Sequence, residues 1–121
     1  MKKILIIDDD EVSIFVTKKL LEFNNDYDII TFKSAQKALY FLENNKIDLI
    51  FLDINMPCMD GFQFLEEFQK LNIESKPQVV ICTSSDRKSD KDKSMKFENV
   101  IGYLDKSLQY QSIARILENL K

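Results

Sequence analysis

The 121-residue sequence predicts an α/β fold, a doubly wound parallel sheet of five strands with five helices. Its apolar residues switch repeatedly between short continuous runs and stripes at helical spacing. The runs are typical of strands covered on both faces, and regular alternation of the two patterns implies a parallel sheet between helices. Right-handed crossovers leave few topologies, and a barrel of eight such units needs roughly 250 residues. The doubly wound sheet therefore fits this chain length.

Five segments predict strands. These are residues 4–7, 27–32, 47–54, 79–82 and 100–104. The third is the longest run, and Asp53, near its end, is its only interior charge. Pro77 introduces the fourth.

Helical spacing predicts helices between and after the strands. We expect Asp9 or Asp10 to cap the first helix and Ser34 to cap the second. Residues 85–97 are highly charged and only weakly amphipathic, and residues 108–120 form the last helix. The apolar residues that define the other helical stripes are Val12, Phe15, Val16, Leu20 and Phe23, then Ala38, Leu39, Phe41 and Leu42, then Phe62, Leu65, Phe68 and Leu71, and finally Ile113, Ile116, Leu117 and Leu120.

The composition excludes several classes of protein. A hydrophobic share of 45% with 31% charged residues is that of a globular domain, and a net charge of −3 with scattered Lys and Arg gives no basic footprint for nucleic acid. Two distant cysteines argue against a disulfide scaffold and for a reducing compartment. The absence of histidine excludes Ser-His-Asp, Cys-His and the usual zinc sites. No run approaches the ~20 apolar residues of a membrane span. We expect a cytoplasmic protein that binds neither nucleic acid nor membrane.

Polar residues end four of the predicted strands. They are Asp8, Asp9 and Asp10 after the first, Asp53 in the third, Thr83, Ser84 and Ser85 after the fourth, and Asp105 and Lys106 after the fifth. Ligands of open parallel sheets bind outside the carboxyl ends of the strands, so these side chains should meet at one edge.

Their chemistry is coherent with phosphoryl transfer. Carboxylates at close range repel one another unless a cation lies among them, and Mg²⁺ prefers such oxygen ligands. An Asp carboxylate can act as a nucleophile toward phosphorus, while Mg²⁺ and a lysine neutralise charge on the phosphoryl oxygens. A hydroxyl at the end of the fourth strand can donate a hydrogen bond to one of those oxygens.

Four segments, in this order, resemble the receiver domains of two-component response regulators. They are Ile6-Ile7-Asp8-Asp9-Asp10, Leu52-Asp53-Ile54-Asn55-Met56-Pro57-Cys58-Met59-Asp60-Gly61, Cys82-Thr83-Ser84 and Gly102-Tyr103-Leu104-Asp105-Lys106. The resemblance covers essentially the whole chain, and the second segment is highly specific. It implies one flavodoxin-like receiver domain over residues 1–121, with strand order 2-1-3-4-5. Because the sequence ends with the fifth predicted helix, we expect no output domain in it.

The resemblance also assigns the acidic site. Asp53 is then the phosphorylation site, supplied by a histidine kinase or a histidine phosphotransfer protein. Asp8 and Asp9 form the acid pair that holds Mg²⁺ together with Asp53, with Asp9 the more direct ligand, and Asn55 lends its backbone carbonyl.

The same resemblance assigns the residues around the acids. Lys106 pairs with Asp53 and then with the phosphoryl group, Thr83 moves to bond a phosphoryl oxygen, and Ser84 belongs to the same group. Tyr103 changes rotamer with Thr83 and remodels a partner-binding face of the fourth helix, fifth strand and fifth helix. Asn55 and Ser85 are rate-tuning positions. We expect an unidentified downstream protein partner, and a monomer or a weak dimer that forms on phosphorylation.

One position departs from the family pattern. Proline usually follows the lysine, often after a cis peptide bond, whereas Ser107 stands here. A non-proline cis bond costs ~3 kcal/mol, so the Lys106–Ser107 bond can be trans. The side chain of Lys106 would then point in a different direction from that in the family pattern.

Simpler interpretations remain open from the sequence. Asp8, Asp9 and Asp10 can be a solvated strand end with a helix cap, Thr83 a strand-end hydroxyl, Lys106 a surface lysine and Tyr103 a packing residue. For the whole chain, the alternatives are a receiver piece of a longer regulator, a receiver that never takes phosphate, a phosphoaspartate phosphohydrolase and a nucleotide-binding module. A phosphohydrolase usually has a second Asp two residues after its nucleophile, where this chain has Asn55, and a nucleotide-binding module needs a glycine-rich loop that this chain lacks.

Overall fold

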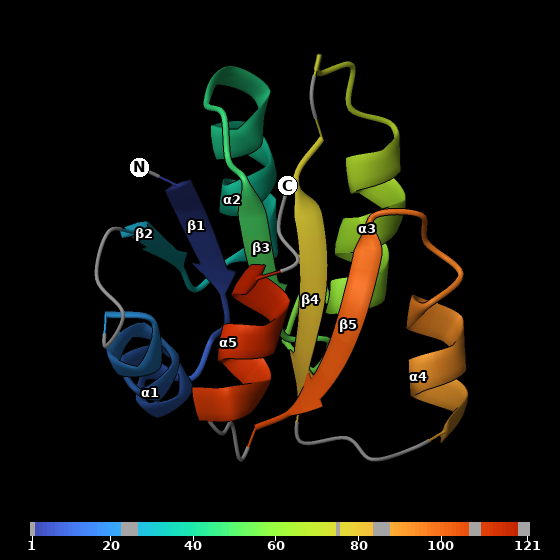
Figure 1. Cartoon of the computed structure of the whole chain (residues 1–121). Coiled ribbons are helices and arrows are strands. Elements are labelled where there is room, and N and C mark those ends of the chain that lie inside the picture. The colour runs from blue at the N-terminus through green and yellow to red at the C-terminus, as the bar shows by residue number, and fades with distance from the viewer. Residues whose placement is uncertain (1, 23–26, 75, 84–87, 107–109, 119–121) are drawn as a thin grey trace.

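The computed structural model describes residues 2–22, 27–74, 76–83, 88–106 and 110–118 (Figure 1). Five strands alternate with five helices, as the sequence predicts. In chain order they are β1 (Lys2–Ile7), α1 (Glu11–Glu22), β2 (Tyr27–Phe32), α2 (Ala35–Asn44), β3 (Leu49–Leu52), α3 (Gly61–Gln69), β4 (Gln78–Thr83), α4 (Lys88–Ser94), β5 (Val100–Asp105) and α5 (Tyr110–Glu118). Among the described helices, none is both long enough and apolar enough to cross a membrane.

All four strand pairs are parallel, and the sheet order is β2-β1-β3-β4-β5. The predicted fold class and strand order are therefore confirmed. The carboxyl ends of the strands all lie at the lower edge of the sheet in Figure 1. β1 and β3 are neighbours although β2 and α2 lie between them in the sequence, so the strand order reverses beside β1.

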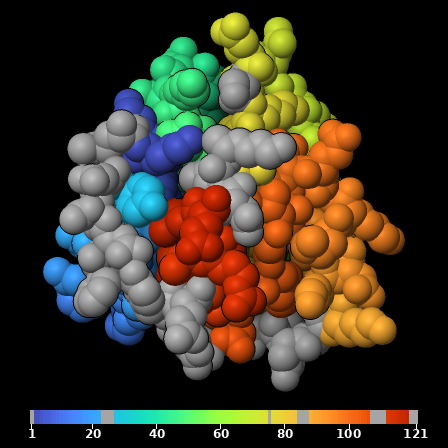
Figure 2. Space-filling model, in the orientation of Figure 1, coloured from blue at the N-terminus to red at the C-terminus, as the bar shows by residue number. Residues whose placement is uncertain are grey.

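Two separate apolar clusters cover the two faces of the sheet. Alternate strand residues point to opposite faces, so neighbours such as Leu5 and Ile6 belong to different clusters. One cluster joins the sheet to α2 and α3 through Ala38, Leu42, Phe64, Leu65 and Phe68. The other joins it to α1 and α5 through Leu21 and Ile113. On this second face, α5 lies between α1 on the left and β5 with α4 on the right (Figure 2).

Side-chain caps fix the starts of three helices. Ser34 Oγ accepts a hydrogen bond from the N–H of Lys37, which confirms its predicted role at α2. Asp10 caps α1, because its carboxylate accepts from the N–H of Val12 at 3.0 Å. Asp60 and Gln63 form a reciprocal capping box at α3. These caps set where each helix leaves the loop at the carboxyl edge of the sheet.

Helix α1 buries a different face from the one that its most apolar positions mark. Val12 and Phe15 are 69% and 60% exposed, whereas Thr17 and Leu21 are buried. Hydrophobic spacing thus predicted the helix correctly but not its orientation on the sheet. Phe23 of the predicted stripe lies outside the described residues.

β1, β4 and β5 are one or two residues longer than expected, and larger differences concern β3 and α4. The run 47–54 contains a strand of only four residues, Leu49–Leu52. Backbone hydrogen bonds nevertheless continue beyond both of its ends, from Asp48 N–H to Lys3 O and from Asp53 N–H to Ile7 O. The charged fourth helix is described from Lys88, because residues 84–87 lie outside the described part of the chain.

The first residue of α3 packs closely against the chain that follows β3. A Cβ on Gly61 would lie 2.6 Å from Ile54 Cα and 2.8 Å from Asp53 O, and both are backbone atoms. At Gly102, by contrast, the nearest atom to an added Cβ is 3.7 Å away.

We therefore expect Gly61→Ala to destabilise the fold by about 1–3 kcal/mol, because the backbone beside Asp53 must shift to admit the methyl group. Gly102→Ala, the matched control, should change the free energy of unfolding by less than about 0.5 kcal/mol. Urea unfolding of the three proteins checks both values, and equal effects of the two substitutions would contradict the close approach.

Candidate functional site

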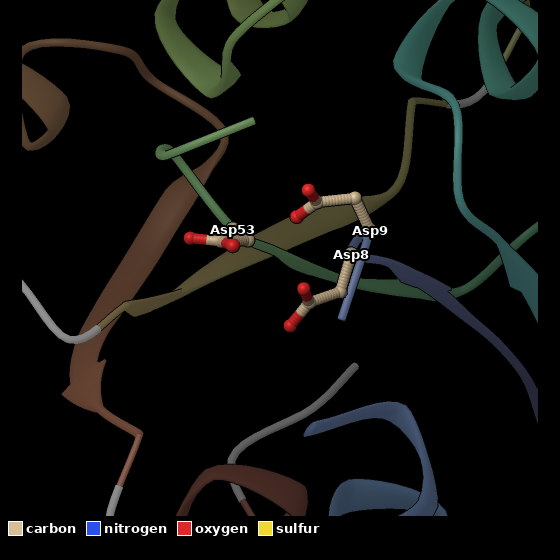
Figure 3. A group of neighbouring side chains, drawn as sticks. All are labelled: Asp8, Asp9 and Asp53. Atoms are coloured by element: carbon tan, nitrogen blue, oxygen red, sulfur yellow. The ribbon is translucent and has the colours of Figure 1, made fainter. Parts of the chain in front are cut away.

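The register of the sheet brings Asp8 and Asp53 together. Ile7 pairs with Leu52, so the next residues, Asp8 and Asp53, leave β1 and β3 side by side. The N–H of Asp53 donates to Ile7 O at 3.0 Å and holds the two strand ends in place. Figure 3 shows the resulting group, with Asp8 and Asp9 at the end of β1 and Asp53 at the end of β3.

These three aspartates can hold a metal ion. One carboxylate oxygen from each lies within 4.8 Å of the others. Asp8 and Asp53 are almost fully buried, at 5% and 2% exposed, while Asp9 is open to solvent. A donor set made only of oxygens with one open side fits Mg²⁺, which binds one or two carboxylates and keeps several waters.

Lys106 reaches this group from the far side of β4. Its Nζ lies 3.1 Å from Asp53 Oδ2 and 3.1 Å from Asp8 Oδ2, and its side chain is 22% exposed. The pairing with Asp53 agrees with the expectation from the sequence, and the contact with Asp8 is an addition to it. Burial lowers the pKa of Lys106, but its hydrogen bonds and ion pairs to Asp53 and Asp8 outweigh this effect and raise it overall. Lys106 is therefore charged.

Asp8 is poised to titrate near neutrality. Burial raises the pKa of its carboxyl to about 6, and the negative charge of Asp53 adds to this effect. The N–H of Asp10, 2.9 Å from Asp8 Oδ1, and the charge of Lys106 oppose it. Lys106 and the N–H of Asp10 thus do not fully offset the effects of burial and of the Asp53 charge on the pKa of Asp8.

Asn55 and Thr83 meet beside the acids. Asn55 Nδ2 donates to Thr83 Oγ1 at 2.9 Å, and the backbone N–H of Asn55 donates to Asp53 Oδ1 at 3.0 Å. The Thr83 side chain, at the end of β4, is fully buried. Both residues were expected at the site, but their contact was not, because 28 residues separate them and only the β3–β4 pairing brings them together.

Of the other predicted residues, only Tyr103 belongs to the described part of the chain. Tyr103, on β5, is partly buried against the apolar cluster that contains α2 and α3. Ser84, Ser85 and Ser107 lie outside the described residues, and with them the geometry of the Lys106–Ser107 bond.

The loop between Asp53 and α3 has a defined shape. Cys58 adopts a φ of 68°, in the left-handed region that few non-glycine residues occupy. This turn lets the N–H of Met59 donate to Pro57 O at 2.8 Å, and the N–H of Gly61 donates back to Ile54 O at 3.2 Å. The loop is therefore anchored at both ends, next to Asp53 and at α3.

Comparison with known proteins agrees with this geometry. The family model described as response regulator receiver domain matches residues 4–118. The chain belongs to this family. The receiver is 35% identical over 91 residues to the response regulator GtcR of Aneurinibacillus migulanus, which covers 75% of the chain. A solved receiver domain from Clostridium thermocellum is 30% identical, with a TM-score of 0.83, and the alignment covers 98% of this chain and 93% of that one. A receiver domain from Methylobacillus flagellatus, only 21% identical, shares the fold with a TM-score of 0.86 over 100% of this chain and 99% of its own.

The curated relatives are longer proteins. The receiver spans 36% of GtcR and 36% of the PhoP regulator of Bacillus subtilis. Likeness to these regulators therefore concerns about a third of their length.

The pKa of Asp8 predicts a pH-dependent affinity for Mg²⁺. Below about pH 6 the ion must displace a proton from Asp8. We expect the apparent affinity, measured by calorimetry, to rise as pH increases from 5 to 7 and to level off above that. Well below the pKa, the change should approach about tenfold per pH unit. In Asp8→Asn the affinity should be lower and lack this step; a wild-type affinity that is constant from pH 5 to 8 would contradict the assignment.

Proposed function

We propose that this receiver takes a phosphoryl group on Asp53 from a histidine kinase or a histidine phosphotransfer protein. The observation that carries the proposal is a buried Asp53 carboxylate, 3.1 Å from the Nζ of Lys106 and grouped with Asp8 and Asp9. Buried charges are costly, so a buried carboxylate kept beside two further aspartates and one lysine supports a role beyond packing. The carboxylates of Asp8, Asp9 and Asp53 and the backbone carbonyl of Asn55 would hold Mg²⁺. When bound, the ion supplies positive charge to the phosphoryl oxygens.

In the proposed step, an oxygen of Asp53 attacks phosphorus of a phosphohistidine. A P–O bond forms as the P–N bond breaks, and the departing imidazole nitrogen takes up a proton. Lys106 stays charged throughout and moves its contact from the carboxylate to the transferred group. Hydrolysis by water later returns the Asp53 carboxylate and inorganic phosphate.

The phosphoryl group would then act on the switch residues. Thr83 lies at the end of β4, next to the site, and its hydroxyl would bond a phosphoryl oxygen together with Ser84. Tyr103 on β5 would change rotamer and alter the face formed by α4, β5 and α5, to which a downstream protein binds. A local change of charge would thus bias a two-state surface. Asn55 and Ser85 would tune the lifetime of the phosphorylated state.

We further propose that residues 1–121 form one receiver domain that acts in the cytoplasm, as a monomer or a weak dimer formed on phosphorylation. The lengths of its relatives keep open the alternative that it works within a longer regulator. A phosphohydrolase is disfavoured by Asn55, because the carboxamide that occupies the position of the acid/base donates its N–H to Thr83.

Incubation with Mg²⁺ and acetyl phosphate tests the proposal directly. We expect the intact mass to increase by one phosphoryl group in the wild-type protein, and the gain to disappear with EDTA or in Asp53→Asn. An unmodified wild-type protein that still binds Mg²⁺ would contradict the proposal and indicate a receiver that works without phosphate.

The role of Lys106 can be tested separately. Lys106→Gln should slow phosphorylation by acetyl phosphate about 100-fold or more, because a positioned charge on the developing transition state is lost. Lys33→Gln is the matched control, since it removes the same charge from an exposed ion pair with Glu11 at the start of α1. It should leave the rate within about twofold, as expected for an exposed pair. Equal slowing in both variants would mean that only the net charge matters.

A further inference from the structure

Asn55 is the residue that connects the phosphoacceptor to the buried hydroxyl of β4. Its backbone N–H donates to Asp53 Oδ1 at 3.0 Å, and its side-chain Nδ2 donates to Thr83 Oγ1 at 2.9 Å. The residue itself is exposed, whereas Asp53 and Thr83 are buried. One loop residue on the surface therefore holds two interior groups on different strands.

The side-chain bond restricts the Thr83 hydroxyl. A hydroxyl has one proton to donate and two lone pairs that accept, and the Asn55 carboxamide occupies one of these lone pairs. The carboxamide thereby fixes the position of Thr83 Oγ1. It also prevents the hydroxyl proton of Thr83 from pointing toward the Asn55 NH₂ group. Any movement of Thr83 away from this place must break the bond.

We propose that the Asn55 carboxamide is a latch, meaning a bond that holds Thr83 in its place before phosphorylation and is released afterwards. The inference rests on the proposed phosphorylation of Asp53. An interaction that is made in one state of a two-state switch and lost in the other stabilises the first state by its own free energy. The latch therefore opposes the switch.

The contact with Asp53 provides the release. Hydrogen bonds to a charged carboxylate are roughly twice as strong as those to a neutral acceptor. Formation of an aspartyl phosphate replaces the carboxylate with a neutral acyl group and moves the negative charge to the phosphoryl oxygens. The hydrogen bond from the Asn55 N–H to Asp53 then weakens. Because Asn55 also holds Thr83 through its side chain, a shift of Asn55 would break that second bond.

A double-mutant cycle with beryllofluoride and Mg²⁺ tests the latch, since beryllofluoride imitates the phosphoryl group without chemistry. The variants are Asn55→Ala, Thr83→Val and the double variant, and Val keeps the branched shape of Thr in a buried strand. We expect Asn55→Ala to tighten beryllofluoride binding about fivefold when Thr83 is present, the size of one ordinary hydrogen bond. In the Thr83→Val background it should change nothing.

Other results of the cycle overturn the latch. Weaker binding on Asn55→Ala in both backgrounds means that the carboxamide contacts the phosphoryl group itself. Weaker binding only with Thr83 present means that it aims the hydroxyl at the phosphoryl group. Equal tightening in both backgrounds means that Asn55 is a steric barrier.

The resting bond has its own readout, independent of any phosphoryl chemistry. Thr83→Val should shift the side-chain NH₂ resonances of Asn55 in the NMR spectrum of the unphosphorylated protein. The NH₂ resonances of Asn45, which donates to Phe41 O at 2.9 Å far from the site, serve as the control and should not move. Unshifted Asn55 resonances overturn the latch alone. A wild-type protein that passes this test but does not bind beryllofluoride overturns the proposed phosphorylation instead, and the release step with it.

Discussion

The ion pairs of Lys106 with Asp8 and Asp53 are the constraint around which the carboxyl edge of the sheet is organised. Two nearly buried carboxylates whose oxygens lie within 4.8 Å of each other repel, and Lys106, from a position beyond β4, pairs with both and reduces this cost. Three aspartates share this edge with Lys106, and burial together with the charge of Asp53 keeps the pKa of Asp8 raised. A cation held among the three carboxylates, as proposed for Mg²⁺, would offset their mutual repulsion.

The sheet topology explains why these acids and no others are involved. Asp8 and Asp53 follow the last residues of the β1–β3 pairing, beside the point where the strand order reverses. At such a point the neighbouring crossovers diverge to opposite faces and leave a crevice at the carboxyl ends. Asp48 also lies next to β3 but at its opposite end, where it accepts a hydrogen bond from the N–H of Lys3 and takes no part in the site. Position along a strand thus separates Asp48, a structural carboxylate, from the carboxylates of the candidate site.

Much of this organisation was predictable from the sequence, for identifiable reasons. Apolar runs and polar strand ends are local patterns, so the five strands, the strand-end acids and Lys106 could all be assigned without coordinates. The buried face of α1 could not be assigned from the sequence. Val12 and Phe15, which are exposed, fit helical spacing as well as the buried Thr17 and Leu21 do. The bond from Asn55 to Thr83 also escaped, since side-chain contacts across strands depend on register and on loop shape.

The loop after Asp53 would determine how a structural change at the proposed phosphoacceptor reaches its neighbours. A flexible loop would absorb a structural change at Asp53. This loop is instead restrained by the hydrogen bond from Gly61 N–H to Ile54 O, by the close approach of Gly61 to Asp53 O and by the Asp60 cap of α3. Of its side chains, that of Asn55 faces solvent and still reaches Thr83. Because the anchored end of the loop resists movement, weakening of the Asn55–Asp53 contact by phosphorylation would, under the proposed latch, be relieved at the contact with Thr83. In the proposed switch, the restrained loop would therefore direct the change from Asp53 toward β4.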